Sequence, residues 1–204
     1  MNRMHKTIGV LGGTFDPVHY GHLSIVVAAR DELALDLVLL MPAHVSPFKL
    51  DRKTAPEEDR IAMLRLAAED LDRVEVSTLE TDSDEISYTY LTLTRLAALY
   101  PEDRILFLMG TDSFLDLERW HKGPELLRQF AFGLAPRPGF DRAAYEAQLA
   151  YYREKYDADV TVLQNELVPV SSTEVREAVR TGKDISGYLP EKVKDYIYEH
   201  GLYR

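Results

Sequence analysis

The sequence predicts an α/β fold with a mostly parallel sheet of five or six strands and helices on both faces. Short apolar runs with the composition of buried strands alternate along the chain with longer segments whose apolar residues recur at helical spacing. Three helical segments begin at a proline (Pro56, Pro124 and Pro190) and two end at a glycine (Gly182 and Gly201), as helices commonly do. Strands that alternate with helices are joined by crossovers, which favours parallel pairing with helices covering both faces.

The predicted strands are short segments rich in aliphatic and β-branched residues. They are 7–12, 36–42, 74–78, 104–110, the start of 131–139, and 159–163. The first runs directly into glycines and the second ends at Pro42. Because parallel sheets of this kind bind ligands beyond the carboxyl ends of their strands, the residues that follow the first and fourth strands are the first candidates for a site.

The predicted helices show apolar residues three and four positions apart. They are 21–35, 56–70, 89–100, 124–130, 141–156, 172–182 and 190–201. The helix at 56–70 opens with proline followed by acidic residues, and the last two helices have glycine at or near their ends. The loop 42–56 between the second strand and its helix contains three prolines and is long enough to suggest a functional role.

Composition limits the classes of protein to consider. A chain of 204 residues with 46% hydrophobic residues fits one domain, 1–204, with a sizeable core. The absence of cysteine excludes disulfides, thiolate metal sites and a cysteine nucleophile. A net charge of −10 argues against a surface that binds nucleic acid, and no apolar run approaches the length of a membrane span. We therefore expect a soluble, cytoplasmic protein.

The segment GGTFDPVHYGHL, residues 12–23, has the features of a phosphate site. Glycines after a strand allow backbone N–H groups to approach a phosphate, and the N-terminus of the next helix attracts anions. His19 and His22 are three residues apart, so their imidazoles share a helical face, and Gly21 between them is expected to leave room for a ligand. Two alternatives are a pair of metal ligands and a histidine that caps the helix.

A second segment, VPVSSTEVREAV at 168–179, places three hydroxyl residues before a helix that carries Arg176. Thr173 with Glu174 would make an ordinary helix N-cap. The hydroxyls of 171–173 and the guanidinium of Arg176 could equally bind a polyphosphate, because arginine can donate to two oxygens at once. Together, the two segments suggest two binding elements for one triphosphate.

These motifs resemble the nucleotidyltransferase superfamily. The sequence HYGH at 19–22 is similar to its (T/H)xGH signature, and SSTEVR at 171–176 is similar to its SSTxxR motif. Further segments resemble the bacterial nicotinate-nucleotide adenylyltransferase family: MPAHVSPFK (41–49), ISYTYLTL (86–93), GTDSFLDLERWHK (110–122), APRPGF (135–140) and the tail 188–203. One departure is Phe48, which stands where the family often carries histidine and cannot donate a hydrogen bond.

The resemblance implies a Rossmann-like fold and an enzyme of NAD biosynthesis. This enzyme would transfer AMP from ATP to nicotinate mononucleotide, giving deamido-NAD and pyrophosphate by in-line attack without a covalent enzyme intermediate. It implies Mg²⁺ carried on the ATP phosphates, no protein-held metal that we can name, no nucleic acid or membrane partner, and it leaves a homo-oligomer open.

The resemblance also implies the site residues. His19, His22 and Arg176 would be catalytic, with His19 as the main donor to the transition state. The residues implied for ATP are Gly12, Gly13, Thr14, Phe15, His19, His22, Gly110, Asp112, Ser171, Ser172, Thr173 and Arg176. The residues implied for nicotinate mononucleotide are Lys49, Tyr88, Thr89, Trp120, His121 and Arg137. Trp120 would stack on the pyridine ring, and backbone N–H groups near Thr89 and His121 would receive the carboxylate.

Other functions remain compatible with the sequence. A sibling adenylyltransferase would use nicotinamide mononucleotide or phosphopantetheine with the same ATP site. A non-catalytic nucleotide-binding module would keep the glycines but need not keep His19, His22 and Arg176, all of which are present. A metal hydrolase would use the two histidines with further ligands.

Overall fold

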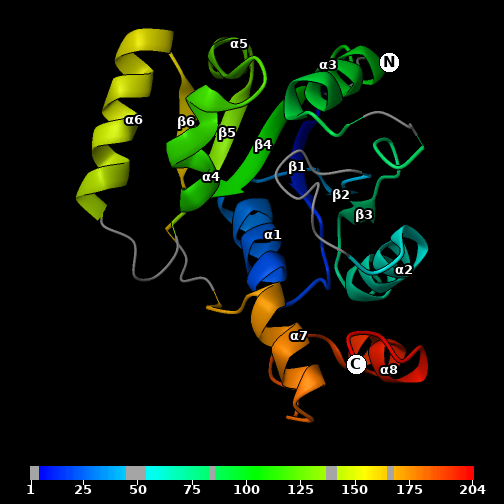
Figure 1. The fold of residues 1–204 in the computed structure, drawn as a ribbon. Helices are drawn as coiled ribbons and strands as arrows, with labels where there is room; N and C mark the ends of the chain where they lie inside the picture. The colour runs from blue at the N-terminus through cyan, green and yellow to red at the C-terminus, as the bar shows by residue number, and fades with distance from the viewer. Residues whose placement is uncertain (1–4, 45–53, 83–85, 137–141, 165–167) are drawn as a thin grey trace.

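A computed structural model of the chain describes residues 5–44, 54–82, 86–136, 142–164 and 168–204. Within these residues, six strands form one sheet in which every neighbouring pair is parallel. The strands are β1 (Thr7–Gly13), β2 (Leu37–Pro42), β3 (Val74–Val76), β4 (Arg104–Gly110), β5 (Ala131–Ala135) and β6 (Asp159–Val162). Their order is β3-β2-β1-β4-β5-β6, so the direction of winding reverses between β1 and β4 (Figure 1).

The helices cover both faces of this sheet. The helices α1 (Tyr20–Glu32), α2 (Glu57–Ala68), α7 (Ser172–Arg180) and α8 (Glu191–Glu199) contribute side chains to one apolar cluster. The helices α3 (Thr89–Leu99), α4 (Thr111–Asp116), α5 (Gly123–Gln129) and α6 (Arg142–Tyr156), with the short 3₁₀ turn η1 (Leu117–Arg119), contribute to the other. The predicted three-layer α/β fold, Rossmann-like and parallel throughout the described residues, is confirmed.

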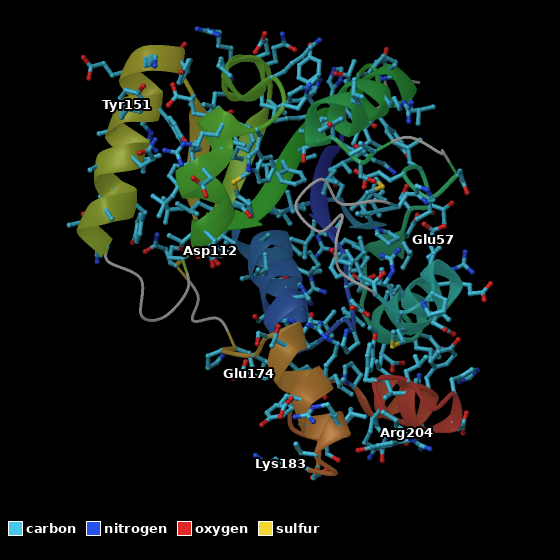
Figure 2. All side chains as sticks on the ribbon, viewed as in Figure 1. Glu57, Asp112, Tyr151, Glu174, Lys183 and Arg204 are labelled. Carbon is cyan, nitrogen blue, oxygen red and sulfur yellow. The ribbon has the colours of Figure 1, made fainter. Side chains whose placement is uncertain are left out.

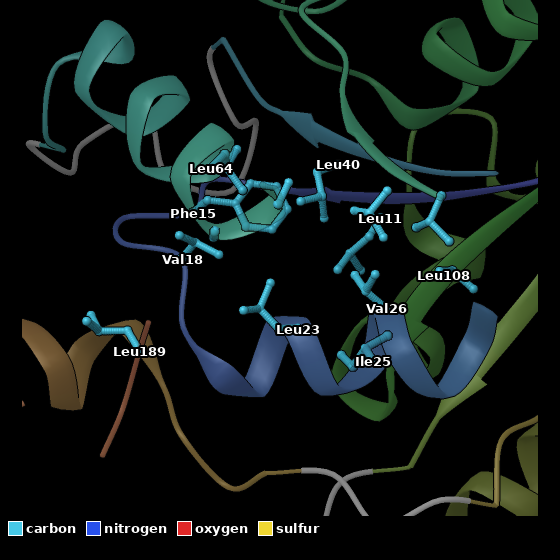
Figure 3. Close-up of a cluster of buried hydrophobic side chains, with 14 of the residues drawn as sticks. Leu11, Phe15, Val18, Leu23, Ile25, Val26, Leu40, Leu64, Leu108 and Leu189 are labelled. Carbon is cyan, nitrogen blue, oxygen red and sulfur yellow. The ribbon is translucent and has the colours of Figure 1, made fainter. Parts of the chain in front are cut away.

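The core follows from the alternation of side chains along the strands. Leu40 and Leu108 point to the α1 face, whereas their neighbours Met41 and Met109 point to the α3 face. Both faces are apolar, as expected of strands that are buried on two sides. Figure 3 shows the α1 side, where side chains of β1, β2 and β4 lie over Leu23 and the rest of the apolar face of α1.

Two expectations about the elements were incomplete. The sequence pattern predicted no helix between 104–110 and 124–130, but α4 and η1 occupy residues 111–119. The predicted strand that begins at 131 ends at Ala135, and residues 137–141 lie outside the described part of the chain. In the described residues, no helix combines the length and the apolar character that crossing a membrane would require.

Candidate active site

The two predicted segments meet at the turn that follows β1, beside the point where the sheet reverses its winding order. The chain leaves β1 at Gly13 and turns through residues 14–19 before α1 begins. Phe15 has a left-handed backbone with φ of 49°, which is uncommon for a residue other than glycine. Such a conformation persists only where the surroundings hold it, and it marks this turn as a functional candidate.

The side chain of Phe15 anchors the turn in the core. It is 1% exposed and belongs to the α1-side cluster, where it lies close to Leu64 and Val18 (Figure 3). Buried Arg60 of α2 holds the turn from outside, because its Nη1 donates to the Thr14 carbonyl at 2.7 Å and its Nη2 donates to the Ala43 carbonyl at 2.9 Å. Only the backbone of Phe15 is therefore left to face a ligand.

The two histidines lie against each other at the start of α1. His19 is the N-cap residue and is 3% exposed, and its ring stacks on that of His22 with centroids 3.8 Å apart. The edge of the Phe15 ring packs against His22, with centroids 4.9 Å apart. This packing fixes both imidazoles in place, and fixed donors are more effective at developing charge than donors that must reorganise.

The space at Gly21 has a different use from the one expected. A Cβ atom there would lie 2.6 Å from the carbonyl oxygen of Val170 and 2.9 Å from the ring of His19. The space is thus filled by protein backbone, and the expectation that it leaves room for a ligand was wrong. The glycine instead allows the segment before α7 to lie directly against α1. At the N-terminus of α1, the N–H of Tyr20 already donates to the carbonyl of Tyr188 at 2.8 Å, so this N–H is engaged within the protein.

Helix α7 brings the second segment to the same turn. Nη1 of Arg176 donates to the carbonyl of Asp16 at 2.6 Å, and the hydroxyl of Ser172 donates to the carbonyl of Pro17 at 2.9 Å. Nη2 of Arg176 donates to Oγ1 of Thr173 at 3.2 Å. The guanidinium therefore lies beside the segment that leads into His19, as a shared triphosphate site requires.

The helix cap considered at Thr173 as an alternative to phosphate binding lies two residues earlier in the structure. Ser171 is the N-cap of α7 and forms a capping box with Glu174: the Ser171 hydroxyl accepts from the Glu174 N–H, and the Glu174 carboxylate accepts from the Ser171 N–H. Figure 2 shows Glu174 at the end of α7 that lies next to α1. With Ser171 engaged in the cap, Ser172 and Thr173 lie in the first turn of α7.

A cavity of about 220 Å³ lies on the α3 face of the sheet, beside the glycines that end β1. Six of the residues that line it come from β1, α3, α4 and the segments that follow β1 and η1: Gly12, Gly13, Thr14, Thr89, Ser113 and Trp120. Thr89 is the first residue of α3, so the positive end of this helix borders the cavity. The predicted residues Gly12, Gly13, Thr14, Thr89 and Trp120 are thus brought together.

The remaining predicted residues lie around this cavity or outside the described part of the chain. Half-buried Trp120 packs against Phe107 at a centroid distance of 6.3 Å, and exposed His121 packs on the ring of Tyr88 at 4.5 Å. Gly110 is the N-cap of α4, and exposed Asp112 lies in the first turn of that helix (Figure 2). Lys49 and Arg137, with Phe48, fall outside the described residues.

Glu80 also lines the cavity and was not among the residues predicted from the sequence. Its Oε1 accepts from the hydroxyl of buried Thr92 at 2.5 Å, and burial raises the pKa of this carboxyl despite hydrogen bonds from Thr92 and Ser87. Ser87 in turn accepts from the N–H of His44 at 3.0 Å. The only feature of the sequence that could have indicated Glu80 is its position, since it follows β3 at the same edge of the sheet as the other candidates.

No group of three or more His, Cys, Asp or Glu side chains that could hold a metal ion occurs among the residues that the structure describes. A magnesium ion that arrives on ATP would not need such a group, because Mg²⁺ keeps several waters and binds substrate phosphates.

Comparison with known proteins identifies the family. The cytidylyltransferase-like family model matches residues 10–178. A relative from Desulfitobacterium hafniense, named "Probable nicotinate-nucleotide adenylyltransferase", is 37% identical over 204 residues, which cover 100% of this chain and 99% of the relative. A relative of the same name from Roseiflexus is 40% identical over 199 residues, covering 97% and 98% of the two chains.

This chain belongs to the nicotinate-nucleotide adenylyltransferase family. It is therefore an enzyme that transfers a nucleotidyl group.

Solved structures share the fold of this family member along its length. The nicotinic acid mononucleotide adenylyltransferase of Plasmodium falciparum complexed with APC superposes with a TM-score of 0.80 at 22% identity, over 98% of each chain. The same Plasmodium protein complexed with NaAD gives a TM-score of 0.78 at 22% identity and the same coverage.

Proposed function

We propose that this adenylyltransferase joins ATP and nicotinate mononucleotide to form deamido-NAD and pyrophosphate, a step of NAD biosynthesis. Membership of the family carries this assignment. The observation in this chain that supports it best is the cavity bordered by Gly12 and Gly13 on one side and by Trp120 and the N-terminus of α3 on the other. One end of such a cavity suits a phosphate and the other suits an aromatic acid.

The reaction requires positioning and charge stabilisation more than acid–base chemistry. An oxygen of the mononucleotide phosphate attacks the α-phosphorus of ATP, a new P–O bond forms, and the bond from the α-phosphorus to the bridging oxygen breaks with release of pyrophosphate. The nucleophile is already an anion, so no proton has to be removed from it. The Mg²⁺ of the substrate MgATP neutralises part of the phosphate charge, as in other phosphoryl transfers.

In this proposal His19 and His22 donate to the oxygens around the α-phosphorus. Their stacked, buried arrangement supports a preorganised donor pair. Arg176, with Ser172 and Thr173 from the first turn of α7, binds the phosphates that leave as pyrophosphate. The contact of Arg176 with Asp16 supports this, because it holds the guanidinium beside the turn that leads to His19.

The acceptor end of the cavity accounts for the pyridine acid. The indole of Trp120 would stack on the pyridine ring. The carboxylate would lie at the first turn of α3, at Thr89, where the unpaired N–H groups of a helix end favour an anion. Tyr88 and His121, which pack on each other, would form the wall of this pocket. Lys49 and Arg137 would contact the phosphate or ribose of the mononucleotide, whereas Asp112 would bind a ribose hydroxyl of ATP.

The amide, nicotinamide mononucleotide, is a second candidate acceptor, and Glu80 is the reason to test it. An ionised Glu80 in the cavity would accept a hydrogen bond from a carboxamide and repel a carboxylate. Burial raises the pKa of Glu80, which keeps this carboxyl neutral to a higher pH and favours the acid. We therefore expect any advantage of the acid over the amide to decline as the pH rises through the pKa of Glu80.

A pyrophosphate-release assay tests the proposal. ATP is supplied with nicotinate mononucleotide, nicotinamide mononucleotide or phosphopantetheine, and kcat/KM is measured for each acceptor. We expect the first to be the best acceptor, and Trp120→Leu to raise its KM without changing the KM for ATP. A higher kcat/KM with phosphopantetheine, or release of pyrophosphate from ATP without any acceptor, would refute the assignment.

A further inference from the structure

The segment that follows α8 returns to the turn after β1. Tyr203 is half-buried with φ of 62°, and it packs together with Leu202 against the α1-side cluster. Its hydroxyl donates to Oδ1 of Asp16 at 2.8 Å. Neighbouring Arg204 donates to the carbonyl of Tyr198 at 3.1 Å, which holds the segment beside α8 (Figure 2).

Asp16 is the residue at which these segments meet. It is 6% exposed, and its Oδ1 also accepts from the N–H of Ala55 at 3.1 Å. Arg176 approaches the same residue in two ways: Nη1 donates to the Asp16 carbonyl at 2.6 Å and lies 3.7 Å from Oδ2. One buried aspartate thus links the segment after α8, the segment before α2 and the arginine of α7.

The two donors determine how strongly Asp16 holds the arginine. The hydroxyl of Tyr203 and the N–H of Ala55 both bind Oδ1, which leaves Oδ2 near Arg176 but beyond hydrogen-bonding distance. Burial and the charge of Asp16 raise the pKa of Tyr203, so the hydroxyl stays protonated and remains a donor. Arg60 is the other cation whose charge acts on this phenol and on Asp16, and it is engaged by the carbonyls of Thr14 and Ala43.

We propose that Tyr203 is a positioning residue for ATP: by holding Oδ1 of Asp16, it keeps Asp16 from forming a close ion pair with Arg176, so that the guanidinium remains available to the triphosphate. This inference rests on the proposed role of Arg176 in ATP binding. Without the hydroxyl, the carboxylate would be short of one donor and would turn toward the guanidinium, the nearest cation. It would then compete with the phosphates of ATP for Arg176.

Removing the Tyr203 hydroxyl should weaken the binding of ATP and leave the binding of nicotinate mononucleotide nearly unchanged. Loss of this hydrogen bond to a buried carboxylate should weaken the binding of MgATP by about tenfold. The acceptor cavity is lined by other residues, so the KM for nicotinate mononucleotide should change less than twofold. A residue with a merely structural role would lower the melting temperature without this difference between the two substrates.

The test is Tyr203→Phe, with Tyr198→Phe as the matched control because exposed Tyr198 engages this segment only through its backbone carbonyl. Binding of the Mg²⁺ complex of α,β-methylene-ATP, measured by isothermal titration calorimetry without any acceptor, gives the affinity of the site directly. We expect about tenfold weaker binding for Tyr203→Phe and no change for Tyr198→Phe. In an Asp16→Asn background, Tyr203→Phe should have no further effect, because the competing charge is gone.

Equal affinity of Tyr203→Phe and wild-type enzyme for the analogue would overturn the inference, whatever happens to the melting temperature. So would a tenfold loss that persists in the Asp16→Asn background. The proposed function fails separately: a wild-type enzyme that binds the analogue but does not use nicotinate mononucleotide refutes the acceptor assignment and leaves this test valid. A wild-type enzyme that does not bind the analogue refutes both.

Discussion

At the scale of single residues, the two histidines differ in their surroundings. His19 is buried at the N-cap of α1, whereas His22 is half-buried one turn further and supports it by stacking. A donor that is fixed by packing stabilises developing charge without reorganisation. We therefore expect the substitution of His19 to affect the chemical step more than the substitution of His22.

Replacing His19 by alanine should lower kcat at least about a hundredfold, because the loss of one preorganised donor typically costs this much. Circular dichroism and binding of an ATP analogue should show a folded protein that still binds nucleotide. The control is His200→Ala, an exposed histidine that stacks on Tyr196 at the end of α8. A kcat within a few-fold of wild type for His19→Ala would remove this residue from its proposed role.

Glu80 gives a pH-dependent prediction. Burial raises its folded-state pKa above the ordinary value of 4.5, so the folded state holds this proton to a higher pH than the unfolded state does. The contribution of the group to stability is therefore greatest below that value and is lost as the pH rises through the folded-state pKa. Glutamine does not titrate, so the melting temperature of Glu80→Gln minus that of wild type should become more positive between pH 4 and pH 8.

Thermal unfolding of both proteins at four or five pH values measures this difference. The matched control is Glu75→Gln, a substitution of an exposed glutamate on β3. A difference for Glu80→Gln that falls with rising pH would show that the carboxyl is stabilised in its charged form instead.

At the scale of elements, the site depends on the close contact of α1 with the segment before α7. Gly21 is needed for it, since any Cβ would meet the Val170 carbonyl. Alanine is favoured over glycine by about 0.8–1 kcal/mol in a helix interior, so propensity alone predicts a more stable protein. The 2.6 Å clash with backbone should reverse that sign.

We expect Gly21→Ala to lower the melting temperature and to weaken ATP binding, because α7 and Arg176 must move away from α1. Calorimetry and thermal unfolding check both effects. Gly187→Ala is the matched control, because a Cβ there meets nothing within 4 Å and no positive φ is required. A Gly21→Ala enzyme that is as stable as wild type and binds ATP normally would contradict this account of the contact.

Helix α6 supports the segment that carries Trp120. Glu118 of η1 accepts hydrogen bonds from Lys155 at 2.7 Å, from Tyr151 at 3.1 Å and from Tyr156. The lysine and the tyrosine hydroxyls lower the pKa of Glu118 to about 2, so the cluster is fully formed above pH 4.5 and is lost as the pH falls through about 2. Trp120 follows two residues later.

Glu118→Ala should raise the KM for nicotinate mononucleotide by about two- to fivefold, a modest effect because the cluster is exposed to solvent. The KM for ATP should not change, since α7 and the turn after β1 are remote from α6. Steady-state kinetics distinguish the two substrates, with Glu154→Ala on the exposed face of α6 as the control. Equal changes in both KM values would argue against a specific role in holding Trp120.

The elements that the sequence predicted are those with long, periodic patterns or with proline and glycine at their ends. Helix α4 was missed because Thr111–Asp116 is only six residues long and has no side-chain cap. The cap considered for α7 was Thr173, although the S-x-x-E spacing of Ser171 and Glu174 indicates a capping box that starts at Ser171. Glu80 offered only its position after β3, and Tyr203 could not be found, because its significance depends on a contact with Asp16 at the other end of the chain.

At the scale of the whole molecule, the parallel sheet was predictable because both of its faces are covered and its strands read as apolar runs. The strand order was not predicted, yet it decides the site: it places β1 next to β4, and the glycines that end β1 next to the residues that follow β4. The approach of α7 to the β1 turn likewise depends on tertiary contacts.

The chain has a net charge of −10 and its proposed substrates are polyanions, so the substrate-borne cation should be essential. Removing Mg²⁺ with EDTA should abolish pyrophosphate release and leave the melting temperature of the enzyme without nucleotide unchanged. Activity should return when MgCl₂ is added. A fall of several degrees on adding EDTA would instead indicate a metal ion held by the protein itself.

The position of α7 in the chain has a consequence for synthesis of the protein. After the ribosome has translated β1 and the two histidines that follow it, it must still translate β2 to β6 before it reaches Arg176. A nascent chain, or a fragment that stops before Ser172, therefore has the imidazoles but lacks the guanidinium. On the proposed role of Arg176, tight binding of ATP would therefore begin only after α7 has been translated and has folded against the turn after β1.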